Sequence, residues 1–173
     1  MITKIEKEGQ IPTENAINKI SHTLFIIDEK QKSFPLQDVL KKKLKRIGKK
    51  INDLKKAPIV TELKDGGIVC WVMASDSINL FQCHTLLRKT LTSILNEKPT
   101  SISIMCQVED KLSKLWGEAA VYVALLNTQK LPSHKKDNKN VPLRNLILYG
   151  ITSSIDLGTI SATVAGNTLT REL

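Results

Sequence analysis

Short apolar runs alternate along the chain with longer stretches in which apolar residues recur every three or four positions. The short runs predict β-strands, because their length and their branched side chains are typical of strands. The run at 68–74 is apolar at every position, so we expect it to lie centrally in a sheet that is covered on both faces. The other predicted strands span residues 20–28, 59–63, 101–108 and 143–149, with a tight Asp-Gly-Gly turn at 65–67 and Gly150 closing the last strand.

The stretches with helical spacing predict helices over residues 36–47, 77–96 and 110–127. The first follows Pro35 and ends at Gly48, and the second begins at an N-cap formed by Asp76 or Ser77. The second half of the third is apolar on all sides, so we expect it to be nearly enclosed. The buried positions are expected to be Leu36, Val39, Leu40, Leu44 and Ile47 in the first helix, Leu80, Cys83, Leu87, Leu91, Ile94 and Leu95 in the second, and Leu112, Leu115, Trp116, Ala119, Ala120, Val123 and Leu126 in the third. The order β-α-β-β-α-β-α-β-α predicts an α/β fold in three layers, with a mixed β-sheet flanked by helices.

Residues 156–173 predict a further helix, started by Thr159 or Ser161, that has no stop signal. One apolar stripe holds Leu157, Ile160, Val164 and Thr168, and the adjoining one holds Ala162, Ala165, Leu169 and Leu173. Two interpretations stay open: a C-terminal helix that frays, or a linker that leads toward an absent second domain. The second interpretation divides the chain into an α/β domain at 1–150 and a linker helix at 151–173.

The net charge of +9 is concentrated in one segment of this 173-residue chain. Residues 30–56 hold eleven basic and two acidic side chains, so this segment accounts for the whole excess. On the helix at 36–47 and just after it, the candidate polyanion-binding residues are Lys41, Lys42, Lys45, Arg46 and Lys49, within the basic stretch 41–50. Clustered lysines on a helix give weak, salt-sensitive binding to phosphates. The alternative is a solvated helix face, which the 4% aromatic content favours because bases have few rings on which to stack.

No motif in the chain predicts catalysis. There is no Gly-x-Gly-x-x-Gly, no Walker phosphate loop and no Gly-x-Ser-x-Gly elbow, and His22, His84 and His134 are widely separated. Cys83 and His84 are neighbours, which on a helix point about 100° apart, so they do not have zinc-ligand spacing. The sequence therefore predicts no catalytic residue, no metal ligand and no cofactor site in the chain.

The three cysteines and the absence of a targeting segment predict a cytoplasmic protein. Cys70 and Cys106 lie in apolar strand-like runs and Cys83 lies on a helix, which indicates buried free thiols in a reducing compartment. No apolar run approaches the roughly 18 residues needed to cross a membrane, and the N-terminus is too charged to be a signal peptide.

An ordered series of short segments carries a family resemblance. The segments are Leu-Leu-Arg-Lys-Thr-Leu at 86–91, Glu-Lys-Pro at 97–99, the apolar stretch 120–126, Leu-Pro-Ser-x-Lys-Lys at 131–136, Leu-Ile-Leu-Tyr-Gly at 146–150, and Gly-Asn-x-Leu-x-Arg-x-Leu at 166–173. In this order they resemble the N-terminal domain of bacterial cytosolic leucyl aminopeptidases, and 166–173 is similar to the linker helix of that family. Thr168 and Thr170 depart mildly from the small residues that are usual there.

The resemblance implies a macro-domain-like fold without chemistry of its own. In that family two divalent metals, zinc or manganese, are held by a C-terminal catalytic domain, and the full protein is a hexamer that acts in peptide catabolism. The implied partners are therefore the chain's own catalytic domain and further copies of itself, and the implied role is assembly and access to the active site. The competing hypothesis is a stand-alone module that binds nucleic acid or another polyanion.

Overall fold

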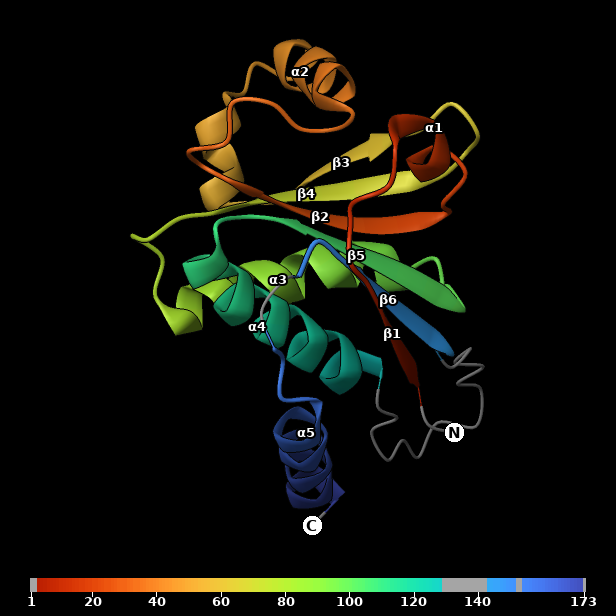
Figure 1. The fold of residues 1–173 in the computed structure, drawn as a ribbon, viewed down its shortest axis with the longest axis vertical. Coiled ribbons are helices and arrows are strands. Elements are labelled where there is room, and N and C mark those ends of the chain that lie inside the picture. Colours follow the sequence, from red (N-terminus) through yellow and green to blue (C-terminus); the bar gives the residue numbers. More distant parts are fainter. Residues whose placement is uncertain (1–2, 129–142, 152–153, 173) are drawn as a thin grey trace.

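The computed structural model describes residues 3–128, 143–151 and 154–172, and it places a mixed β-sheet between two layers of helices (Figure 1). The predicted polar loop at 130–142, with His134, lies outside the described residues. The elements are β1 (Lys4–Glu8), α1 (Glu14–Ile17), β2 (His22–Asp28), α2 (Gln37–Arg46), the short 3-10 helix η1 (Ile51–Lys55), β3 (Ile59–Glu62), β4 (Ile68–Ala74), α3 (Leu80–Leu95), β5 (Ser101–Gln107), α4 (Asp110–Thr128), β6 (Asn145–Tyr149) and α5 (Leu157–Glu172). The predicted α/β three-layer fold with a mixed sheet is confirmed.

The sheet has six strands in the order β1-β6-β5-β2-β4-β3. Every neighbouring pair is parallel except β3 with β4, which form an antiparallel hairpin. Parallel neighbours need a crossover segment, and the helices supply it. The central position predicted for 68–74 is confirmed, because all seven residues of β4 are buried and the strand lies between β2 and β3.

The alternation of side chains along the strands builds a separate core on each face of the sheet. Leu24 and Ile26 of β2 face the layer of α3 and α4, whereas Phe25 and Ile27 face the layer of α1, α2 and η1. On the second face, Phe25 stacks on Trp71 with ring centroids 4.9 Å apart, and the Trp71 indole donates a 2.8 Å hydrogen bond to Thr61 Oγ1. The two apolar faces explain why β2 and β4 read as continuous apolar runs.

The sequence analysis missed β1, α1 and η1. β1 was read only as a charged N-terminal segment, yet it pairs in parallel with β6, with Lys4 opposite Asn145 and Glu8 opposite Tyr149. Its sequence, Lys-Ile-Glu-Lys-Glu, is typical of an edge strand, where solvent reaches much of the surface, so no apolar run marks it.

The predicted bounds of several elements are also wrong by a few residues. Helix α3 begins at Leu80 with Asn79 as its N-cap, not with Asp76 or Ser77, because Asn79 and Gln82 exchange hydrogen bonds with each other's backbone N–H. Helix α2 begins at Gln37, because Leu36 takes a left-handed conformation with φ 61°. Strand β6 begins at Asn145 rather than at residue 143.

Three apolar side chains predicted to be buried are exposed, namely Ile47, Leu80 and Leu115. Each lies at the end of a helix or at the margin of its apolar stripe. The nearly complete enclosure predicted for the second half of α4 is confirmed, since 119–121 and 123–125 are buried.

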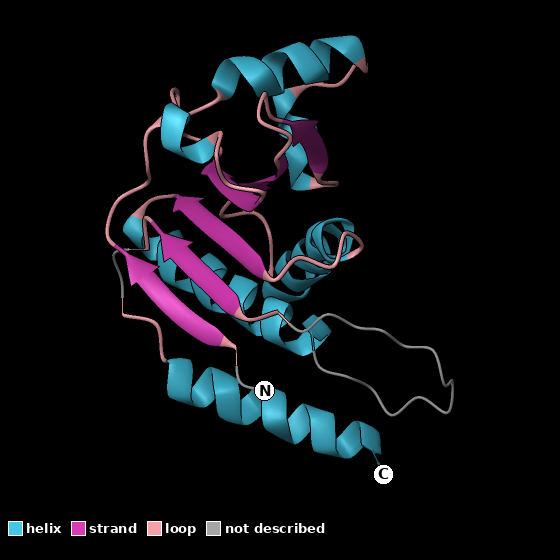
Figure 2. Cartoon of the chain, turned by 90° about the vertical axis from the view of Figure 1, so that its right-hand side faces the viewer, coloured by secondary structure: helices cyan, strands magenta, loops and turns pink. Residues whose placement is uncertain are grey.

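Helix α5 leaves the sheet and packs on α4 (Figures 1 and 2). It begins at Leu157, and Asp156 caps it, because the Asp156 carboxylate accepts hydrogen bonds from the Thr159 N–H (2.9 Å) and hydroxyl (2.6 Å); Thr159 and Ser161 are therefore not its caps. Ile160 and Val164 are buried, whereas the predicted second stripe, at Ala162, Ala165 and Leu169, is exposed. Among the described residues, no helix is long and apolar enough to cross a bilayer.

Candidate functional site

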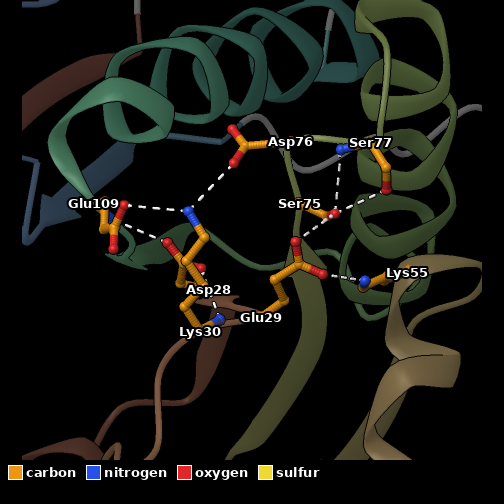
Figure 3. A network of polar contacts seen from close by, with 8 residues as sticks. All are labelled: Asp28, Glu29, Lys30, Lys55, Ser75, Asp76, Ser77 and Glu109. Atoms are coloured by element: carbon orange, nitrogen blue, oxygen red, sulfur yellow. Dashed lines mark hydrogen bonds and ion pairs between the residues drawn. The ribbon is translucent and has the colours of Figure 1, made fainter.

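The carboxyl edge of the sheet is the first place where this topology brings polar residues together. After β2 the chain passes to the layer of α2, whereas after β4 and β5 it passes to the layer of α3 and α4. Open α/β sheets usually bind their ligands where neighbouring connections leave toward opposite faces, because a crevice opens there. In this protein that point lies outside the end of β2, and a network of eight polar side chains occupies it (Figure 3).

Asp28, the last residue of β2, holds one half of the network. Its side chain is only 2% exposed, and its two carboxylate oxygens accept hydrogen bonds from the backbone N–H groups of Lys30 (2.9 Å) and Glu109 (3.1 Å). The Lys30 ammonium in turn contacts the carboxylates of Asp76 (3.3 Å) and Glu109 (3.5 Å), which raises the pKa of Lys30. These contacts join the segments that follow β2, β4 and β5.

Glu29 holds the other half. Its carboxylate pairs with the Lys55 ammonium of η1 and accepts a 2.9 Å hydrogen bond from the Ser75 hydroxyl. The bonds from Lys55 and Ser75 lower the pKa of Glu29. Ser75 Oγ also lies 2.8 Å from Ser77 Oγ, so the chain end of β4 is tied to η1 and to the approach to α3.

This arrangement is suited to joining the ends of neighbouring strands rather than to binding an anion. The protein's own side chains satisfy one another, and four carboxylates face two ammonium groups, so the network repels a phosphate. Within 3–128, 143–151 and 154–172, no three His, Cys, Asp or Glu residues are grouped so that they could hold a metal ion. We therefore describe the network as a polar clasp, defined by Asp28, Glu29, Lys30, Lys55, Ser75, Asp76, Ser77 and Glu109.

The basic helix α2 presents a second candidate site. Its predicted residues are all exposed: Lys41, Lys42, Lys45, Arg46 and Lys49. None of them forms an ion pair with an acid in the described part of the chain. Lys42 and Arg46, together with Lys43, line an open pocket of about 470 Å³ beside Thr61 and Glu62 of β3, whereas Lys41, Lys45 and Lys49 do not line it. The arrangement concentrates positive charge beside the edge strand.

Within the described residues, the histidines and cysteines do not form a reactive group. His22 contacts Glu97 (3.1 Å) and Ser21, and His84 stacks on Tyr122 with ring centroids 5.2 Å apart, where burial lowers the pKa of His84. All three cysteines are buried free thiols, as the sequence predicted, and burial raises the pKa of each to about 12. Thiols with such a pKa are poor nucleophiles because they stay protonated.

Sequence reasoning missed the polar clasp, although a signal for it was present. Asp28 is the last residue of an apolar strand, Ser75 directly follows one, and Glu109 comes two residues after one. Polar residues at the carboxyl ends of adjacent parallel strands meet at one edge of a sheet. The strand order, which the sequence does not give, was needed to show that these three ends are neighbours.

Comparison with known proteins finds similarity in structure but not in sequence. No family model matches the chain, and no curated protein matches it by sequence. A solved structure of a point mutant of tomato leucine aminopeptidase has a similar fold, with a TM-score of 0.56 and 11% sequence identity. The match covers 94% of this chain and 36% of that protein, so the chain spans about a third of the length of its structural neighbour. At this identity the comparison shows that the chain has a fold also found within a leucine aminopeptidase.

Proposed function

We propose that this chain is a non-catalytic domain of a leucyl aminopeptidase-like metallo-exopeptidase, and that it corresponds to the N-terminal domain of such an enzyme. The parent protein removes N-terminal amino acids from peptides in the cytoplasm. Two divalent metals, zinc or manganese, are held by its catalytic domain and supply an activated water. The domain described here serves assembly into a hexamer and access to the active site.

The observation that carries this proposal is the extent of the structural match. It takes in nearly the whole of this chain and only about a third of the aminopeptidase, as expected for one domain of a larger enzyme. The ordered sequence segments at 86–150 resemble those of the same family. The exposed side of α5, which carries Leu169 at 63% exposure, gives a catalytic domain a surface on which to pack.

Two measurements test the proposal together. The purified 173-residue chain is assayed with leucine amide in the presence of zinc or manganese, and we expect no turnover. An antibody raised against the chain is then used to isolate the natural polypeptide from its source cells. We expect a polypeptide much longer than 173 residues that releases leucine from leucine amide, loses this activity to a chelator and regains it with metal. A natural polypeptide that lacks peptidase activity when loaded with metal contradicts the proposal.

The basic surface of α2 supports a second candidate function, binding to nucleic acid or another polyanion. The supporting observation is that its five predicted residues are exposed and lack ion pairs with described acids, so their charge is available to phosphates. The solvated-face interpretation predicts instead that duplex DNA does not bind detectably at physiological salt.

A salt titration separates these two interpretations. If about five lysine or arginine side chains contact phosphates, the log–log slope of the binding constant against salt is near −4 to −5, at about 0.9 per contact. Replacing Lys41, Lys45 and Lys49 with glutamine then abolishes binding and leaves the fold intact, since Leu40 and Leu44 hold the helix on the sheet. Absence of a shift at low salt rejects the polyanion function without affecting the aminopeptidase proposal.

A further inference from the structure

A groove between η1 and α3 is the surface feature that the proposed function does not use. It has a volume of about 450 Å³, and its apolar side chains are Ile78, Phe81 and Leu86. Ile78 and Leu86 also pack against the core of the α3–α4 layer, so the floor of the groove is held in place by the fold. Two of the three apolar side chains of the groove are therefore fixed by packing, and the third, Phe81, is exposed.

Phe81 is the unusual residue of this groove. Its side chain is 79% exposed, and the neighbouring Leu80 is 52% exposed, whereas the other two phenylalanines, Phe25 and Phe34, are buried. A phenylalanine that lies in solvent on the first turn of a helix does not contribute its ring area to folding. Adjoining exposed apolar side chains beside a groove are typical of an interaction surface.

The charge around the groove indicates the chemistry of its partner. Lys55, Lys56 and Lys89 line it, and among the residues that the structure describes no acidic side chain does. Lys55 is engaged by Glu29 of the polar clasp, but Lys56 and Lys89 form no ion pair with an acid in the described ranges. A partner that covers Phe81 therefore meets uncompensated positive charge, and acidic groups on the partner are favoured.

The shape of the groove favours a segment of polypeptide over a small ion. Phe81, Thr85 and Lys89 follow one another at intervals of four residues, so they lie along one face of α3 and span about 12 Å. A second copy of this chain is disfavoured in this groove, because Lys55 and Lys56 belong to the segment 30–56, where eleven basic and two acidic side chains concentrate the positive charge of every copy.

We propose that this groove binds an acidic peptide segment of a partner protein, with a bulky apolar side chain of the partner against Phe81 and carboxylates on Lys56 and Lys89. The apolar contact contributes affinity by removing Phe81 from water, and the two ion pairs orient the segment along α3. This interaction goes beyond the aminopeptidase assignment and does not depend on it.

The test uses a fluorescein-labelled peptide of about 12 residues, which spans roughly 18 Å as a helix. The peptide alternates pairs of Glu or Asp with pairs of Leu or Phe, and fluorescence anisotropy measures its binding to the full chain. We expect a Kd of about 10–100 µM. We expect Phe81→Ser and Lys89→Glu each to weaken binding about tenfold or more. Both residues are exposed, so both variants should keep the near-UV circular dichroism of the parent chain.

Matched controls separate groove binding from general attraction to a basic protein. Lys64→Glu makes the same charge change in the exposed turn between β3 and β4, outside both the groove and the basic surface of α2, and we expect it to alter the Kd less than twofold. A peptide in which Ser replaces every Leu and Phe should bind about tenfold more weakly. The proposal is overturned if the first peptide does not bind at millimolar concentration, if Lys64→Glu weakens binding as much as Lys89→Glu, or if the serine peptide binds equally well.

Discussion

Replacing Asp28 with asparagine tests whether one buried carboxylate holds the polar clasp together. Asp28 accepts two backbone hydrogen bonds, one from the segment after β2 and one from the segment that enters α4. Asparagine keeps the shape of the side chain but offers one acceptor oxygen, and its NH₂ group meets the second N–H as a donor facing a donor. The substitution therefore removes one charge-assisted hydrogen bond and leaves the second hydrogen bond in place.

The expected magnitudes follow from the number of hydrogen bonds lost. A hydrogen bond to a charged group contributes about 1.5–3 kcal/mol, so we expect Asp28→Asn to lower the free energy of unfolding by about that amount. Asp28→Ala removes both acceptors, and we expect it to cost about 3–5 kcal/mol, because water can reach the two partly buried N–H groups and limits the loss. Asp65→Asn, in the exposed turn between β3 and β4, is the matched control and should change stability by less than about 0.5 kcal/mol.

Urea unfolding followed by tryptophan fluorescence measures these differences. Trp71 and Trp116 are both buried, one on each face of the sheet, so their emission reports loss of both cores. The order of stability should be wild type and Asp65→Asn, then Asp28→Asn, then Asp28→Ala, with similar urea m-values. If Asp28→Asn is as stable as the wild type, the carboxylate does not hold the clasp and the reasoning is refuted.

Four further predictions rest on local features of the fold. The three cysteines should stay unreactive toward a thiol reagent at pH 8 until the chain unfolds, because burial raises the pKa of each to about 12. For the same reason the free energy of unfolding should fall as pH rises above about 9, because the thiols of the unfolded chain then release protons that the buried thiols retain. Urea unfolding at pH 8 and at pH 10 measures this change, and a higher stability at pH 10 would contradict it. Asn79→Ala should cost about 1 kcal/mol in urea unfolding by removing the cap of α3, and a neutral result means that the cap does not stabilise the helix. Gly150→Ala should destabilise the chain far more than Gly48→Ala. Both glycines have positive φ, but of the two only Gly150 would place its new Cβ 2.6 Å from a backbone oxygen, that of Cys106. Equal changes in melting temperature for the two variants would contradict this.

The fold class could be predicted from the sequence because the patterns that mark strands, helices and turns are local. The fully apolar run at 68–74 required cover on both faces, and the structure places it inside the sheet between two helical layers. Gly48 ends α2 and Gly150 follows β6, both with positive φ, as glycines that close an element often do. The burial of the three cysteines also followed, since each lies within an apolar pattern.

The edge strand and the candidate sites depended on tertiary structure. β1 has too few apolar residues to be recognised alone, and only pairing with β6, distant in sequence, makes it a strand. Asp28, Ser75 and Glu109 are separated by dozens of residues, and the strand order β5-β2-β4 is what brings them together. The groove with Phe81 could not be predicted for a similar reason. Helical spacing shows which residues share a face of α3, but only the packing of the whole chain leaves Phe81 in solvent beside Lys56 and Lys89. Local sequence thus determined the elements and their buried sides, whereas contacts between distant segments decided which polar and apolar side chains meet at the surface.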